Sequence, residues 1–297
     1  MNHLSKSVVL RVMIAAFAAI ILLCSIILSS GCMSMKNKYE LPSVVAHRGG
    51  ADLAPENTLA AFELGLTFDP DMIELDVHLS KDGVLMVFHD PLLARTTGQD
   101  GAISDYEAAT LATFDAAANY EKGHTFGFQK IPTLAEVVDL VEQKALRPVY
   151  YQIEIKVKED GSRYEEIEYK LVDFLQERNL IEHTIVISFD FPTLAKLGKL
   201  EPTLKLGALI SKTYMMNIGA GGPRAVAADI ASLKTDYVGI NYRYLTQVLF
   251  DELRKENLGI GAWTVNDEPT MKKLVQMRVD FITTNRPDIL RKTLAQL

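Results

Sequence analysis

The chain has 297 residues, of which 48% are hydrophobic and 23% are charged, and its formal net charge is −7. This composition excludes the intrinsically disordered class, and the negative charge argues against a nucleic-acid partner because phosphate backbones select basic surfaces. The length suits one or two domains, and about 250 residues is the size of a single α/β barrel.

The first 32 residues resemble a bacterial lipoprotein signal. Lys6 and Arg11 precede the apolar run 12–28, and the small residues 29–31 lead to Cys32. This order of segments is typical of a secreted precursor. We therefore expect Cys32 to be lipidated and the protein to be membrane-anchored outside the cytoplasm. An uncleaved transmembrane anchor is the alternative, because the apolar run reaches the lower length limit of a spanning helix, about 17 residues.

After a polar tether over residues 33–43, short apolar runs alternate with helical patterns. The predicted strands are 44–47, 72–78, 149–157, 184–189, 204–210, 237–241, 260–265 and 281–284. The predicted helices are 57–67, 133–144, 164–178, 193–200, 224–233, 246–256, 269–277 and 287–296. Strands that each precede a helix imply parallel pairing through crossover helices. The pattern predicts an α/β fold, a (β/α)₈ barrel over residues 44–297.

One segment departs from this alternation. About fifty residues separate the second strand from its helix, and they include an extra strand at 84–88 after a turn at 81–83. We expect residues of about 84–131 to form a small insertion on the loop side of the barrel.

Several side chains are expected to cap helices. Asn57 and the pair Thr133 and Glu136 precede or open predicted helices, as capping residues do. The same role is expected for Asn266, Asp267 and Asn285, although Asn285 follows the last strand and can also reach the carboxyl end of the barrel.

Polar side chains gather at the carboxyl ends of the first strands, where barrel enzymes carry their active sites. Residues two positions apart on a strand share a face, so polar triplets on the second and third strands point into the barrel. The residues concerned are His47 and Arg48 on the first strand, Glu74, Asp76 and His78 on the second, His89 after the extra strand, and Gln152, Glu154 and Lys156 on the third.

Glu74, Asp76 and Glu154 are expected to converge. Buried carboxylates repel one another unless a cation joins them. Because all the donor atoms are oxygens, the pattern favours one divalent cation, Ca²⁺ or Mg²⁺, over zinc. A salt-bridge cluster with Arg48 and Lys156 is the alternative. The two histidines beside the carboxylates favour a functional site.

The chain from residue 44 nearly to its end resembles the glycerophosphodiester phosphodiesterase family. The resemblance rests on an ordered set of motifs: "AHRGG…APENTLAAF", "IELDVHLSKDGVLMVFHDP", "IPTLAEVVDL", "QIEIK", "ISFD", "AWTVND" and "ITTNRPD". It implies a TIM barrel, dependence on a divalent metal, and hydrolysis of glycerophosphodiesters to glycerol 3-phosphate and an alcohol.

The resemblance also implies a role for each matching residue. It assigns acid–base catalysis to His47 and His89, metal ligation to Glu74, Asp76 and Glu154, and phosphate binding to Arg48 and Lys156. Glu56 is expected to contact the ligand or support a residue that does, and Trp263 to flank the substrate. In this family the neighbouring glycerol hydroxyl is thought to attack, and water then opens a cyclic phosphate.

Two other functions are considered. A lysophospholipase D would use the same site on membrane lipids, and a surface binding protein would keep the barrel without turnover. The presence of both histidines and all three carboxylates argues against a binding protein.

The loop 211–224 is apolar and glycine-rich, which suits a mobile lid, a lipid contact or an ordinary packed loop. The alcohol part of the substrate and the oligomeric state stay open.

Overall fold

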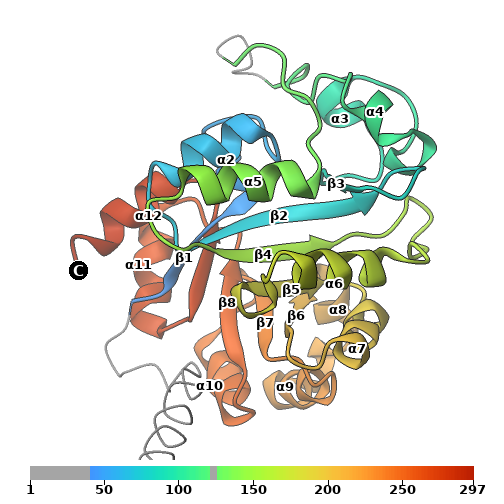
Figure 1. The fold of residues 1–297 in the computed structure, drawn as a ribbon. Coiled ribbons are helices and arrows are strands. Elements are labelled where there is room, and N and C mark those ends of the chain that lie inside the picture. Colours follow the sequence, from blue (N-terminus) through green and yellow to red (C-terminus); the bar gives the residue numbers. More distant parts are fainter. Residues whose placement is uncertain (1–40, 121–125) are drawn as a thin grey trace, which may run out of the picture. The chain divides into compact units, whose positions relative to one another are not determined.

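The protein, seen in a computed structural model that describes residues 41–120 and 126–297, contains a closed barrel of parallel strands (Figure 1). The barrel strands are β1 (Ser43–Ala46), β2 (Met72–Leu79), β4 (Tyr150–Ile155), β5 (Thr184–Ser188), β6 (Lys205–Ile210), β7 (Tyr237–Asn241), β8 (Gly259–Trp263) and β9 (Phe281–Thr284). Each pairs in parallel with its neighbour, and the pairing of β9 with β1 closes the barrel. The predicted (β/α)₈ barrel is confirmed.

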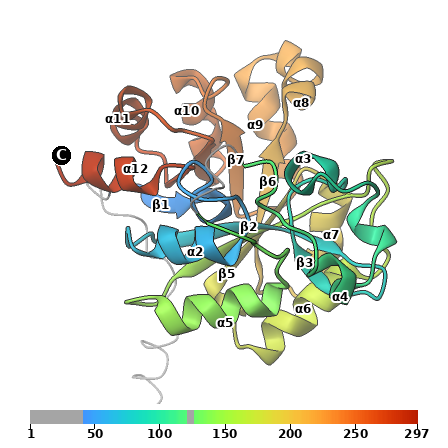
Figure 2. The same cartoon turned by 90° about the horizontal axis from the view of Figure 1, so that it is seen from above.

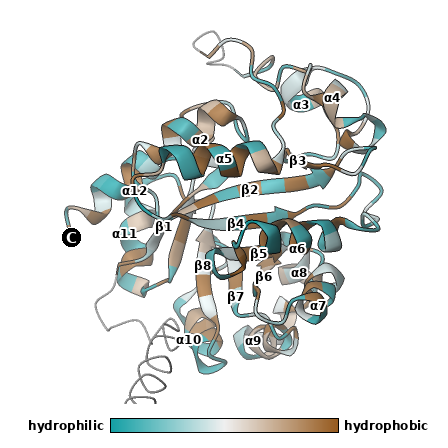
Figure 3. Ribbon diagram, viewed as in Figure 1, coloured by the Kyte–Doolittle hydropathy of each residue, from teal (hydrophilic) through white to brown (hydrophobic). Residues whose placement is uncertain are grey.

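Helices surround the barrel in the positions that the alternation predicts (Figure 2). They are α2 (Leu59–Leu66), α5 (Leu134–Lys144), α6 (Ile167–Glu177), α7 (Phe191–Leu200), α9 (Pro223–Ser232), α10 (Gln247–Lys255), α11 (Glu268–Met277) and α12 (Pro287–Leu294). On α5, Leu134, Val137, Val138 and Val141 recur at helical spacing and are buried. Both hydrophobic and hydrophilic segments of this helix are visible in Figure 3.

The predicted signal, its alternative as an uncleaved anchor, and residues 33–40 of the tether lie outside the described residues. Within the described part of the chain, every helix is too short or too polar to cross a membrane.

The interior of the barrel below the site is apolar. Val45, Ile185, Ile187, Leu209, Tyr237 and Phe281 form a buried cluster. Gly261 on β8 makes room for one of its rings, because a Cβ atom at this position would lie 1.8 Å from Phe281 Cε2. The cluster gives the polar residues above it a closely packed floor.

The chain between β2 and α5 adds a small unit on the mouth side. β3 (Leu85–Val87) pairs antiparallel with the last residues of β2, beyond the point where β1 stops pairing with β2. The short helices α3 (Ala94–Thr97) and α4 (Ala108–Leu111) follow. This unit has a hydrophobic cluster of its own, which includes Met86, Phe88, Leu93, Ile103 and Leu111.

The expected loop 211–224 contains the short helix α8 (Lys212–Asn217). The hydroxyl of Tyr214 donates a hydrogen bond to Asp229 Oδ2 at 2.6 Å, and Met215 and Ile218 pack against the core. Met216 is 69% exposed. Most of the apolar character of this segment is therefore used in packing.

The predicted caps have different outcomes. The capping box of Thr133 and Glu136 is confirmed, and Asp267 caps α11 as expected. The prediction that Asn57 caps α2 is wrong, because the side chain of Thr58 accepts the capping hydrogen bond from Ala61 N. The prediction for Asn266 is also wrong, because its Oδ1 accepts from the backbone N–H of Asn285 instead.

Candidate active site

A tight turn at the end of β1 presents the first two site residues. His47, Arg48 and Gly49 form a tight turn, in which Arg48 has a left-handed φ of 51°. Gly49 has a φ of 82°, and a Cβ atom there would lie 2.7 Å from the backbone of α2. Only glycine lets the turn pack this closely on the helix while adopting a positive φ.

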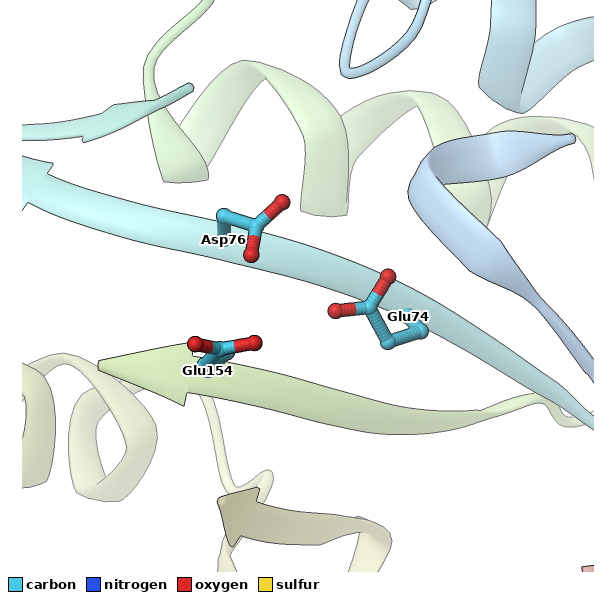
Figure 4. A group of neighbouring side chains, drawn as sticks. All are labelled: Glu74, Asp76 and Glu154. Atoms are coloured by element: carbon cyan, nitrogen blue, oxygen red, sulfur yellow. The ribbon is translucent and has the colours of Figure 1, made fainter. Parts of the chain in front are cut away.

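Three carboxylates meet where β2 and β4 lie side by side (Figure 4). Asp76 is opposite Glu154 in the parallel register, and Glu74 lies two residues earlier on the same face of β2. Each residue offers an oxygen atom within 4.8 Å of the others, and their exposed fractions are 2%, 0% and 8% for Glu74, Asp76 and Glu154. The predicted convergence is therefore confirmed.

Two cations flank this cluster. The Nζ atom of Lys156 lies 2.6 Å from Glu154 Oε1 and 3.2 Å from Asp76 Oδ1. The Nε atom of Arg48 lies 3.4 Å from Asp76 Oδ2. The salt bridges with Arg48 and Lys156, which were predicted as the alternative to a metal site, are thus present in the same cluster.

The charges of the three carboxylates and the two cations in this cluster do not balance. Burial raises the pKa of Glu74, and the neighbouring Asp76 and Glu154 raise it further. Burial also raises the pKa of Glu154, although Lys156 opposes this effect. Burial alone would raise the pKa of Asp76, but Lys156 and Arg48 hold it well below its usual range. Three carboxylates beside two cations leave one negative charge in excess, which a proton or a metal ion can offset. The donor set therefore fits a hard divalent cation.

His47 is held by Asn285, which follows β9. Its Nδ1 atom lies 2.6 Å from Asn285 Oδ1, while Asn285 Nδ2 donates to Asp52 Oδ1 at 3.2 Å. Because a carboxylate only accepts, this contact orients the amide and assigns the His47 ring proton to Nδ1. The other ring nitrogen, Nε2, lies 3.9 Å from Glu74 Oε2. Burial lowers the pKa of His47 to about 3, so the neutral form is favoured.

His89 follows β3 and is held through its side chain and its backbone. Its Nδ1 atom lies 2.5 Å from Asp90 Oδ1, so Nδ1 donates and Nε2 is left for the cavity. The carbonyl oxygen of His89 accepts from Nε2 of the buried His78 at 3.1 Å, and Tyr164 O–H donates to His78 Nδ1 at 2.9 Å. His78 therefore supports the loop that carries His89.

Glu56 connects Arg48 to the insertion. Its Oε1 atom accepts from Arg48 Nη1 at 2.9 Å and from Arg95 Nη2 at 2.5 Å. The family resemblance implied a role in ligand contact or support, and these contacts are those of a supporting residue.

These groups surround a cavity of about 170 Å³. It is lined by His47, Arg48, Glu74, His89, Gln152, Glu154, Ile187, Phe189, Leu209, Trp263, Thr264 and Thr283. Trp263 and Phe189 meet edge to face with ring centroids 5.6 Å apart. The cavity joins an apolar, partly aromatic wall to a wall of charged groups, which suits a small ligand with both apolar and charged parts.

A family model described as the glycerophosphoryl diester phosphodiesterase family matches residues 47–289. The chain belongs to this family. The predicted enzyme class, a phosphodiester hydrolase, is confirmed by this membership, and the family is metal-dependent. A glycerophosphodiester phosphodiesterase of Caldanaerobacter subterraneus subsp. tengcongensis is 33% identical over 247 residues, which cover 83% of this chain and 95% of the relative.

Solved structures share the barrel of this phosphodiesterase family. A phosphodiesterase of Oleispira antarctica, solved in complex with the product sn-glycerol-3-phosphate, is 26% identical with a TM-score of 0.70, and the match covers 86% of this chain and 97% of that one. A structure from Agrobacterium tumefaciens matches with a TM-score of 0.78 at 24% identity and covers 87% of this chain and all of that one, which supports the fold.

The sequence-predicted site residues of this phosphodiesterase lie together. His47, Arg48, Glu74, His89, Glu154 and Trp263 line the cavity, Asp76 and Lys156 lie in the charged cluster, and Glu56 contacts Arg48. Sequence reasoning missed Phe189, which lines the cavity. It left open whether Asn285 caps a helix or reaches the site, and the contact of Asn285 Oδ1 with His47 Nδ1 shows that it reaches the site. Phe189 and Asn285 each follow the carboxyl end of a barrel strand, and this position in the sequence could have marked both as site residues.

Proposed function

We propose that this protein hydrolyses glycerophosphodiesters to glycerol 3-phosphate and an alcohol. The observation that carries the proposal is the pair of histidines that face one cavity beside three buried carboxylates. The names of the relatives and the product-bound Oleispira structure support the substrate class.

In this proposal Glu74, Asp76 and Glu154 hold one divalent cation, Ca²⁺ or Mg²⁺. The bound ion would polarise a phosphoryl oxygen and offset its negative charge. Arg48 and Lys156 supply further positive charge to the phosphate, whose anionic character otherwise repels a nucleophile.

The two histidines move the protons. The His47 ring, with its proton on Nδ1, has an Nε2 lone pair that can accept a proton, and His89 also turns Nε2 toward the cavity. One removes the proton of the neighbouring glycerol hydroxyl as it attacks phosphorus, and the other protonates the departing alkoxide. Water then opens the cyclic phosphate with the roles reversed. The aromatic edge of Trp263 and Phe189 would pack on the glycerol carbons.

The lysophospholipase D alternative is not favoured, because the named relatives and the product-bound structure point to glycerophosphodiesters.

We also propose that Cys32 is lipidated, on the strength of the sequence pattern around it. Metabolic labelling with a fatty acid, in the natural chain and in Cys32→Ser, tests this anchor. Equal labelling of the two proteins would contradict it.

The assay uses the protein from residue 36 onward and measures glycerol 3-phosphate released from glycerophosphocholine and glycerophosphoethanolamine. Ca²⁺, Mg²⁺ and EDTA are compared, with His47→Ala as the catalytic variant and His183→Ala as a matched histidine outside the cavity. We expect metal-dependent release that His47→Ala abolishes and His183→Ala retains. No release with either metal would overturn the proposed function.

A further inference from the structure

An ion-pair chain crosses the mouth of the barrel from the insertion. At its centre is Arg95 on α3, whose Nη1 and Nη2 atoms bind the two carboxylate oxygens of Glu56 at 3.1 and 2.5 Å. The Nε atom of the same guanidinium donates to Asp90 Oδ2. Arg95 thus joins two loops that are 34 residues apart in the chain, at positions 56 and 90.

Each end of this series of ion pairs contacts a residue of the proposed catalytic site. Asp90 binds His89 Nδ1 at 2.5 Å, and Glu56 binds Arg48 Nη1 at 2.9 Å. His89 and Arg48 both line the cavity, whereas Arg95 does not. Among the described residues, the contacts of Arg95 lead to His89 through Asp90 and to Arg48 through Glu56.

We infer that Arg95 is a positioning residue that sets the orientation of His89 and Arg48, an inference that rests on the proposed function. His89 lies on a loop beyond β3, and a loop side chain is held in one geometry only where other groups constrain it. A planar guanidinium presents its donors in a rigid fork, so Arg95 can hold both carboxylates in one relative arrangement. An ammonium group lacks this fork.

This role differs from that of an ordinary surface salt bridge. The Arg95 side chain is 48% exposed, and ion pairs with this exposure contribute little to stability. Loss of its contacts is therefore expected to leave the Tm almost unchanged while catalysis falls.

The test compares Arg95→Met, Arg95→Lys, Asp90→Asn and the double variant Arg95→Met/Asp90→Asn in the glycerophosphocholine assay. We expect Arg95→Met to lower kcat by about 10- to 100-fold, the range found when an outer supporting group is lost. Arg95→Lys should restore part of kcat. The double variant should lose less than the product of the two single losses, because both act on His89.

A matched control is Arg147→Met. Arg147 is 38% exposed, binds Asp69 and Asp71 just before the start of β2, and does not line the cavity. The Arg147→Met variant loses a comparable pair of ion contacts, and its kcat and KM should equal those of the natural chain.

Nitrogen-15 NMR of the histidine rings gives a readout that does not depend on turnover. The His89 signals, assigned by their loss in His89→Ala, should show a proton fixed on Nδ1 in the natural chain and exchange between tautomers in Arg95→Met. Unchanged His89 signals together with an unchanged kcat in Arg95→Met would overturn the inference. If the natural chain itself shows no diesterase activity, the proposed function fails, and the NMR comparison alone then decides whether Arg95 orients His89.

Discussion

The His47 ring is oriented by groups that lie behind it. Asn285 accepts its Nδ1 proton, and Asp52 in turn fixes which way the Asn285 amide faces. A histidine that must accept a proton at Nε2 needs its other proton held at Nδ1. In the proposed mechanism, the proton-accepting form of His47 therefore depends on three side chains, those of His47, Asn285 and Asp52.

Replacing Asn285 with leucine tests this arrangement. Leucine keeps the approximate size and removes the acceptor, so we expect kcat to fall by about 10- to 100-fold while KM changes little. Steady-state kinetics with glycerophosphocholine measure the effect. Asn217→Leu, at an exposed position on α8 outside the cavity lining, is the matched control. An unchanged kcat in Asn285→Leu would show that other contacts orient His47.

The buried His78 predicts a pH dependence of stability. Burial lowers its pKa from 6.5 to about 4, so between these values the unfolded chain binds more protons than the folded one. Its contribution is fully present above pH 6.5 and is lost as the pH falls toward 4. At pH 5 the loss is about 2 kcal/mol relative to pH 7.5.

Urea unfolding of the natural chain and of His78→Gln at pH 7.5, 6.5, 5.5 and 5.0 checks this prediction. The free energy of unfolding should fall less steeply with decreasing pH in His78→Gln, because that variant lacks the group that titrates. Parallel curves for the two proteins would rule His78 out as the cause.

At the scale of the elements, the alternation of apolar runs and helical patterns was enough to predict every barrel strand to within a few residues. The polar faces of β2 and β4 were predictable for the same reason, since alternation on a strand fixes which side chains share a face. Loop residues have no such period. Asn57 and Thr58 are both capping types, and the choice depends on a contact that only folding creates, from Asn57 Nδ2 to Asp76 Oδ2 at 2.8 Å.

Gly261 on β8 has a steric role that predicts an effect on stability. A Cβ atom at Gly261 would lie 1.8 Å from the ring of Phe281, which is itself packed against Tyr237 inside the barrel. We expect Gly261→Ala to lower the free energy of unfolding by about 1 to 3 kcal/mol, as overpacking does. Chemical denaturation measures the change.

Gly198→Ala is the matched control for this glycine. Gly198 lies within α7, where an added Cβ would come no closer than 3.4 Å to Leu206. Alanine favours a helix interior over glycine by about 1 kcal/mol, so this variant should be neutral or more stable. A Gly261→Ala protein as stable as the natural one would mean that the ring of Phe281 can move.

For the whole molecule, the excess negative charge in the barrel predicts stabilisation by a divalent cation. A ligand at 100 times its Kd adds about 2.7 kcal/mol, which for a domain of this size corresponds to a rise in Tm of about 5 to 10 °C. Differential scanning calorimetry with Ca²⁺, Mg²⁺ and EDTA measures this shift without any substrate.

Glu154→Gln removes one carboxylate of the cluster and should abolish most of the cation-dependent shift. Glu142→Gln, an exposed carboxylate on α5, should keep it. A shift that persists in Glu154→Gln would place the stabilising cation outside the cluster.

The two ends of the described chain emerge on one side of the barrel (Figure 1). The N–H of Ser43, at the start of β1, donates to Asp280 just before β9, and Arg291 near the end of α12 binds Asp69 and Asp71 just before β2. All barrel strands run from this side toward the cavity. A resin, an electrode or a reporter protein joined to the described chain just before β1 or after α12 would therefore leave the mouth of the cavity open to the medium, as an immobilised biosensor requires.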